Sequence, residues 1–160
     1  MRVEIDLDMQ SFFNQGKGIL NEHWSQVANN QDSILLEPDE EKYIFLQKAN
    51  ALLNVVLFDE CGEMIGYSIV FLQPHMHYKN DVFAFVDAIY VREKHRNSRA
   101  GLVLINEVER LCIEKRVSLL SYHTKPAHNT LEKILLKKGY NHVENIFGKT
   151  LKGKVWGSPQ

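Results

Sequence analysis

Residues 82–116 read VFAFVDAIYVREKHRNSRAGLVLINEVERLCIEKR, and they predict a strand, a polar basic turn and a helix in that order. Residues 82–91 are rich in aromatic and β-branched side chains, which is typical of a buried strand. Residues 92–99 hold four arginines or lysines beside one acid, Glu93. From Gly101 onward the apolar residues recur every three or four positions, which predicts a helix with one face in the core. These are Leu102, Ile105, Val108, Leu111 and Cys112.

A polar basic turn that leads into a helix predicts an anion site. The first N–H groups of a helix have no partner within the helix, and the helix dipole is positive at that end. The arginines of the turn add positive charge. The segment therefore predicts a site for a phosphate-sized anion directly after a strand.

Composition limits the class of protein. A chain of 160 residues favours one domain with a substantial core. The net charge of −1 argues against a general nucleic-acid or anionic-membrane binder, so a basic function has to be local. Cys61 and Cys112 are expected to be free thiols. No apolar run approaches the roughly 20 residues of a membrane span, and the acidic N-terminus lacks a signal-peptide pattern, so the expected location is the cytoplasm.

The remaining segments predict an α/β or α+β domain over residues 1–151, with a mixed sheet and a loose tail at 152–160. The expected order is β-α-α-β-β-β-α-β-α-β-β, with six to seven strands and about four helices. The first helix follows Asp8, and Gly16 and Gly18 leave two shorter helices as an alternative. The second begins at Pro38 and the last at Pro126. Residues 73–81 are expected to be a polar loop. The strands are expected at residues 2–7, 53–58, 64–72, 82–91, 117–122, 141–146 and 147–151.

The turn resembles motif A of the GCN5-related N-acetyltransferase (GNAT) superfamily. That motif follows a strand and reads Arg or Gln, two residues, Gly, one residue, Gly or Ala. Here Val91 is followed by Arg96-Asn97-Ser98-Arg99-Ala100-Gly101, so Arg99 replaces the middle glycine. Gly139-Tyr140 also resembles the family's Gly-Phe after the last helix. The turn together with residues 122–129 is similar to small bacteriophage or prophage members of the superfamily.

The resemblance implies a mostly antiparallel central sheet and acetyl-CoA as cosubstrate. Backbone N–H groups of the turn would hold the pyrophosphate, from Arg96, Asn97, Ser98, Arg99, Ala100, Gly101 and Leu102. A bulge near Ile89, Tyr90 and Val91 would present an N–H to the thioester carbonyl, in a gap between this strand and residues 117–122. His128 and Asn129 would lie near the cofactor. Arg99 either points outward or alters the pocket.

The acid and the base of the reaction are less defined. Phe85 stands where family members often carry a glutamate, and Asp87, on the same strand face, is the candidate base. His123 is a second candidate. Leu135 replaces the tyrosine that often protonates the leaving thiolate, so water, Tyr90 or Tyr122 would substitute. The alternative is that Asp87 and His123 are polar residues with structural roles.

The predicted function is transfer of an acetyl group to a primary amine on a small molecule or a protein. The acceptor is expected between the first two helices and residues 73–81, and family members often form homodimers. His75 and His77 lack a third ligand at metal spacing, so no metal is expected. Neither a nucleic acid nor a membrane is an expected partner. The rival interpretation is a non-catalytic protein of this fold that binds acyl-CoA or a partner protein.

Overall fold

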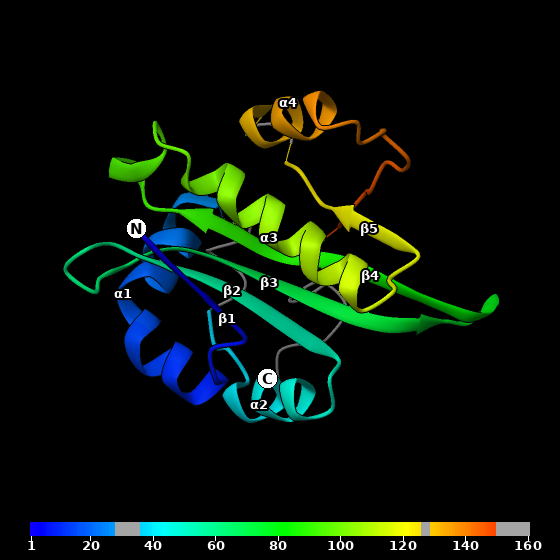
Figure 1. The fold of residues 1–160 in the computed structure, drawn as a ribbon, viewed down its shortest axis with the longest axis horizontal. Coiled ribbons are helices and arrows are strands. Elements are labelled where there is room, and N and C mark those ends of the chain that lie inside the picture. The colour runs from blue at the N-terminus through cyan, green and yellow to red at the C-terminus, as the bar shows by residue number, and fades with distance from the viewer. Residues whose placement is uncertain (28–35, 126–128, 150–160) are drawn as a thin grey trace, which may run out of the picture.

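The computed structural model describes residues 1–27, 36–125 and 129–149, which form one sheet with helices on both faces (Figure 1). Within these residues the sheet has five strands, in the order β1-β2-β3-β4-β5. The strands are β1 (Arg2–Ile5), β2 (Leu52–Phe58), β3 (Met64–His75), β4 (Tyr78–Val91) and β5 (Leu119–Tyr122). The helices are α1 (Met9–Val27), α2 (Glu40–Lys48), α3 (Ala100–Glu114) and α4 (Asn129–Lys137), with a 3₁₀ turn at Glu93–His95.

The sheet is mixed, and its one parallel pair opens partway along. β1 to β4 pair antiparallel, whereas β4 and β5 run parallel. The β4–β5 pairing begins at Phe83 and Leu119 and ends at Val86 and Tyr122. Beyond this point, residues 87–91 of β4 have no strand partner on the β5 side within the described chain. The two strands therefore separate where the resemblance placed a gap.

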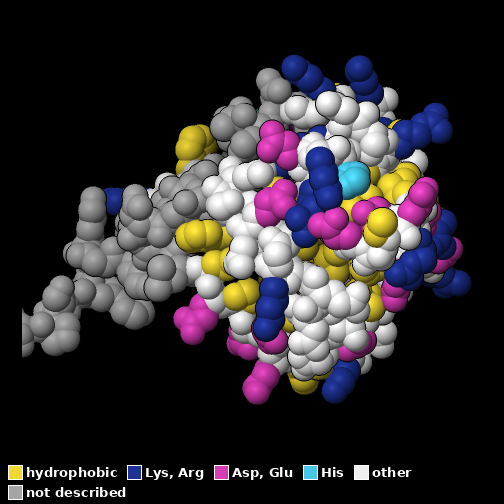
Figure 2. All heavy atoms as spheres, turned by 90° about the vertical axis from the view of Figure 1, so that its left-hand side faces the viewer, with side chains coloured by type: hydrophobic (Ala, Val, Ile, Leu, Met, Phe, Trp, Pro, Cys, Tyr) yellow, Lys and Arg dark blue, Asp and Glu magenta, His cyan; other side chains and the backbone are white. Residues whose placement is uncertain are grey.

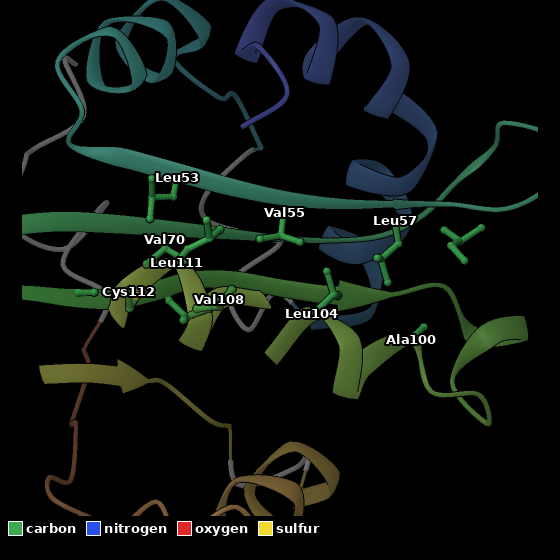
Figure 3. Close-up of a cluster of buried hydrophobic side chains, with 12 residues drawn as sticks. Leu53, Val55, Leu57, Val70, Ala100, Leu104, Val108, Leu111 and Cys112 are labelled. Carbon is green, nitrogen blue, oxygen red and sulfur yellow. The ribbon is translucent and has the colours of Figure 1, made fainter. Parts of the chain in front are cut away.

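α3 covers one face of the sheet, as its apolar spacing predicts. Figure 3 shows Ala100, Leu104, Val108, Leu111 and Cys112 of α3 facing Leu53, Val55, Leu57 and Val70 of the sheet. Ile105 is also buried. Leu102 was expected in this stripe, but its side chain is 40% exposed. The buried stripe runs through Ala100 and Leu104 instead, because the helix meets the sheet with these positions inward.

α1 and α2 cover the opposite face, where the core is rich in aromatic residues (Figure 1). α1 is one continuous helix, so the alternative of two shorter helices is wrong. Gly16 is buried, and a Cβ atom added to it would lie 3.5 Å from the Met64 sulfur. The burial of Met9, Phe12, Phe13 and Ile19 against the sheet outweighs the low helix propensity of the two glycines.

A β-bulge in the middle of β4 changes which residues face each side of the sheet. Ala88 pairs with Ile69, and Val86 pairs with Val70, so Asp87 is the extra residue between them. Before the bulge Val86 packs on the α3 side, whereas after it Ala88 and Tyr90 pack on the α1 and α2 side. The resemblance placed the bulge near Ile89, Tyr90 and Val91, and the structure moves it to Asp87.

The expected loop at residues 73–81 is wrong. Residues 73–81 are not a loop, because β3 and β4 continue through them to a tight turn at Met76 and His77.

The expected strands after the last helix are not found either. Residues 141–149 form no strand, so the expected six to seven strands and the end of the expected order are not matched. A strand needs a paired neighbour and a buried face. Val143, Ile146 and Phe147 instead stay 70%, 68% and 93% exposed. Residues 152–160, the expected loose tail, lie outside the described residues.

Candidate functional site

One cavity of about 850 Å³ lies where α1, the β4–β5 gap, the start of α3 and α4 meet. Nine of the candidate site residues from the sequence line it. They are Asp87, Ile89, Tyr90, Val91, Arg96, Asn97, Gly101, Tyr122 and His123. The unpaired edge of β4 and the beginning of α3 therefore open into the same space as the two candidate bases.

Other residues of the expected site lie elsewhere. Ser98 and Arg99 line a separate hollow of about 430 Å³, beside the turn between β2 and β3. Ala100, the first residue of α3, is buried in the core between α3 and the sheet, and Leu102 is not part of the cavity wall. Asn129 is the first residue of α4, and His128 lies outside the described residues. The Arg99 side chain therefore points away from the cavity, so it does not block a ligand in the cavity from reaching the main chain of the turn.

The N-terminus of α3 presents unpaired donors to the cavity. The Ala100 N–H donates to Ser98 Oγ at 3.1 Å, and the Val103 N–H donates to the Arg99 carbonyl at 2.9 Å. The N–H groups of Gly101 and Leu102, between them, have no acceptor within the described chain. A Cβ atom added to Gly101 would meet nothing within 4 Å outside its own part of the helix. This arrangement suits a phosphate group close to the main chain.

Two of the four basic side chains in residues 92–99 are neutralised by ion pairs. Arg92 pairs with Glu22 at 2.9 Å and with Glu63 at 3.5 Å, and Lys94 pairs with Glu63 at 2.8 Å. Figure 2 shows basic and acidic side chains interspersed on this face of the molecule. Arg96 and Arg99 form no ion pair with a described residue. Arg96 is consequently the cation of the turn that the cavity can use, since Arg99 lines the other hollow.

Arg96 is held in place from three sides. Its Nε donates to the Val91 carbonyl at 2.9 Å, and its guanidinium donates to Gln26 at the end of α1. The guanidinium carbon lies 5.2 Å from the centre of the Tyr90 ring, within range of a cation–π interaction. These contacts fix the charge at the cavity wall and tie the turn to α1.

Asp87 lies on the bulge, at the boundary between the β4–β5 gap and the aromatic side of the sheet. Burial raises the pKa of its carboxyl above the ordinary value, and the nearby His123 partly lowers this pKa again. The Asp87 charge also raises the pKa values of Tyr43 and Tyr67 after the larger effect of burial, so Asp87 lies within electrostatic range of both rings. A carboxylate with a raised pKa is a better proton acceptor at neutral pH.

His23 is a residue of the site that sequence reasoning missed. Its ring stacks on Tyr90 with 4.5 Å between centroids, and its Nδ1 shares a hydrogen bond of 2.6 Å with the Tyr67 hydroxyl. Burial lowers its pKa to about 4, with further lowering by Lys125 and Arg96. The imidazole is therefore neutral at pH 7. No sequence signal joins His23 to Tyr67 or Tyr90, which are distant in the chain, because these contacts depend on how α1 lies on the sheet.

The tyrosines near the cavity differ in what their hydroxyls contact. The Tyr90 hydroxyl donates to Glu22 at 2.9 Å, and burial together with this acceptor raises its pKa to about 12. This hydrogen bond argues against the role of leaving-group acid expected for Tyr90. Tyr122 lines the cavity, and burial raises its pKa strongly. Leu135, where the family often has a tyrosine, is buried.

Two further kinds of feature are absent from the described residues. No group of three or more His, Cys, Asp or Glu side chains there could hold a metal ion. None of the helices in that part of the chain is long and apolar enough to cross a membrane.

Solved structures of acetyltransferases share this fold. An aminoglycoside acetyltransferase, meta-AAC0020, from an uncultured soil metagenomic sample in complex with trehalose is 17% identical with a TM-score of 0.72, and the match covers 94% of this chain and 96% of that one. A ribosomal-protein-alanine N-acetyltransferase from Brucella melitensis biovar Abortus 2308 is 16% identical with a TM-score of 0.69, and the match covers 94% of this chain and 99% of that one. The aminoglycoside N-acetyltransferase AAC(6')-Iy in complex with CoA is 14% identical with a TM-score of 0.69, and the match covers 93% of this chain and 98% of that one. At these identities the likeness establishes the fold alone.

A search of curated proteins found no match to this chain. A sequence model of the acetyltransferase (GNAT) family matches residues 17–140, from the middle of α1 to just beyond α4. The match includes the bulge, the turn and the α3 N-terminus that form the cavity. With most of its length matched, the chain belongs to the acetyltransferase (GNAT) family.

Proposed function

We propose that the protein transfers an acetyl group from acetyl-CoA to a primary amine. The observation that carries this proposal is the α3 N-terminus, where Gly101, whose N–H is free, lines the same cavity as Arg96 and Asp87. The phosphates of CoA match the donors and the positive charge of the turn. The β4–β5 gap gives the pantetheine arm a path from there to Asp87.

Acetyl-CoA supplies an activated thioester, whose carbonyl carbon forms a bond to the amine nitrogen while its bond to sulfur breaks. The chain's part is to position and to move protons. The unpaired edge of β4 after Asp87 supplies backbone N–H groups that stabilise negative charge on the carbonyl oxygen. Asp87 takes the proton of the ammonium group, directly or through one water, so that the nitrogen can attack. His123, beside Asp87, shares this role.

Protonation of the departing thiolate falls to water in this proposal. Tyr90 directs its proton to Glu22, and Leu135 has no proton to give. A thiolate is a stable leaving group, so the reaction proceeds without a dedicated acid. Tyr122 is the tyrosine of the cavity wall that remains as an alternative donor.

The test begins with the melting temperature in the presence and absence of acetyl-CoA. A ligand at 100 times its dissociation constant stabilises the folded state by about 2.7 kcal/mol. The rise should vanish in Gly101→Trp, whose side chain would fill the open space before the helix, and persist in the matched variant Gly101→Ala. Both variants should fold, because either residue has a higher helix propensity than glycine.

Turnover is then followed by release of free thiol with a panel of amines and by the mass increase of the amine. Thiol release that requires both an amine and an intact Asp87 supports the transferase. A melting-temperature rise without turnover on any amine or protein would instead support the rival function, a protein that binds acyl-CoA without catalysis. If millimolar acetyl-CoA does not raise the melting temperature, both the transferase and the acyl-CoA-binding function are overturned.

A further inference from the structure

The cavity has two chemically different halves. One half, at the turn and the α3 N-terminus, offers backbone donors and the positive charge of Arg96. The other half lies between α1, α2 and the facing sides of β3 and β4. Its wall is mainly aromatic and includes the rings of Phe13, His23, Trp24, Tyr43, Tyr67 and Tyr90.

The aromatic rings are packed against one another and form a preorganised surface. Phe13 and Tyr43 meet edge to face at 5.5 Å, and Tyr67 and Tyr90 lie 6.4 Å apart. His23 stacks on Tyr90 at 4.5 Å. Rings held in this way lose little conformational freedom when a ligand binds, so the wall favours an apolar or aromatic ligand surface.

Asp87 is the one carboxylate among the described residues that line the cavity. Glu22 is nearby, but it is occupied by Arg92 and by the Tyr90 hydroxyl. The acids at the start of α2 do not line the cavity, and Asp39 accepts the Lys42 N–H as a helix cap. The aromatic half therefore offers a single negative charge, in a position to meet a single ammonium group.

We propose that the acceptor is a monoamine with an apolar or aromatic body, which packs on the aromatic wall while its ammonium group faces Asp87. This inference rests on the proposed function and narrows its substrate. A polycationic, polyhydroxylated acceptor would leave most of its charges and hydroxyls unpaired against the rings. A folded protein would have to bring its amine past the surrounding helices.

The experiment compares kcat/KM of the full chain for 2-phenylethylamine and hexylamine with kcat/KM for spermidine, kanamycin and a lysine-containing peptide. We expect the two monoamines to exceed each of the others by at least about tenfold, since an apolar group of this size in a matching pocket is worth that factor or more. Acetyl-CoA binding is measured in parallel by the melting temperature.

Two variants on one helix separate the aromatic wall from general effects on stability. Tyr43→Ala removes a ring of the wall, whereas Phe45→Ala removes a ring that is 67% exposed and outside the cavity. We expect Tyr43→Ala to reduce kcat/KM for 2-phenylethylamine about tenfold or more while the acetyl-CoA melting shift persists. Phe45→Ala should leave both unchanged.

The outcomes distinguish this inference from the function beneath it. Efficient acetylation of kanamycin, spermidine or the peptide over the monoamines would overturn the inference and leave the acetyltransferase intact. Equal effects of Tyr43→Ala and Phe45→Ala would also overturn it. Failure of acetyl-CoA to raise the melting temperature would overturn the proposed function, and the inference with it.

Discussion

At the scale of single residues, Asp87 joins a structural irregularity to a chemical role. As the extra residue of the β4 bulge, it lies within electrostatic range of Tyr43, Tyr67 and His123. Bulges re-aim side chains next to active sites. The same position withdraws the carboxylate from water, which raises its pKa. A group that helps catalysis here is therefore expected to cost stability.

Asp87→Asn tests both effects in one variant. As the proposed base is lost, kcat/KM should fall by about 10²- to 10⁴-fold. Because folding raises the Asp87 pKa, burial of its charge lowers the free energy of unfolding. This loss of stability is absent below the unfolded pKa near 3.8 and is fully present once the pH exceeds the folded pKa. The variant should therefore melt at an equal or higher temperature than the parent at pH 7. Glu41→Gln, an exposed charge removal on α2, is the control, and a comparable loss of activity there would count against Asp87.

His23 makes stability depend on pH in the opposite direction. Its pKa falls from 6.5 to about 4 on folding, so between these values the unfolded chain binds more protons. The contribution of His23 to the free energy of unfolding is fully present above pH 6.5 and is lost as the pH falls toward 4. Between pH 7 and pH 5 the loss should be about 2 kcal/mol.

Urea denaturation at the two pH values measures this loss. In His23→Gln the difference in unfolding free energy between pH 7 and pH 5 should shrink by most of that amount. His142→Gln removes a histidine from the exposed segment after α4 and should leave the difference as it is. An unchanged pH dependence in His23→Gln would mean that other groups carry it.

At the scale of elements, the turn before α3 explains how the chain departs from the family motif without closing the site. Arg99 is the N-cap residue of α3, and its side chain lines the hollow near β2 and β3. Gly101, two residues on, lines the cavity, with open space before it. At the start of a helix, residues two positions apart are rotated by about 200° about the helix axis, which directs the Arg99 side chain away from the cavity while Gly101 faces it.

The two arginines should accordingly behave differently. Arg96→Ala removes the charge at the cavity wall and should weaken acetyl-CoA binding about 10- to 100-fold, the range for a charge-assisted hydrogen bond. Arg99→Ala should change the dissociation constant less than about threefold. Isothermal titration calorimetry measures both values. A large effect of Arg99→Ala would show that this side chain reaches the ligand.

At the scale of the whole molecule, two separate cores hold the sheet from its two faces. One core joins α3 to the sheet, and the other joins α1 and α2 to it. β2 lies between both cores, and every residue of it is buried. The cavity lies at the side of this rigid centre, where β4 and β5 separate. Ligand binding should thus order the edge of the molecule and leave its centre unchanged.

Hydrogen exchange followed by mass spectrometry tests that separation. In the free protein, the amides of residues 97–102 and of the unpaired β4 edge should exchange rapidly. Saturating acetyl-CoA should slow them by at least about tenfold, whereas the amides of β2 should be slow with or without the ligand. Uniform slowing across the whole sheet would indicate global stabilisation instead of binding at this edge.

The sequence by itself determined the elements that rest on local patterns. The β4–turn–α3 unit and most of the α3 core face follow from neighbouring residues, because hydrophobic periodicity acts within a few positions. The resemblance to the GNAT superfamily, and not periodicity, pointed to the residues between Asp87 and Gly101 that line the cavity, and anion binding by the turn stays a prediction.

Only the tertiary structure decided the rest, since it depends on partners distant in the chain. Pairing of β4 with β3 placed the bulge at Asp87 and turned Tyr90 toward His23. Packing of α1 on the sheet kept Gly16 and Gly18 in one helix and brought His23 and Gln26 to the cavity. Residues 141–146 have the composition of a strand, yet they form none within the described chain. A strand exists only with a neighbour to share its hydrogen bonds and a core to bury its face.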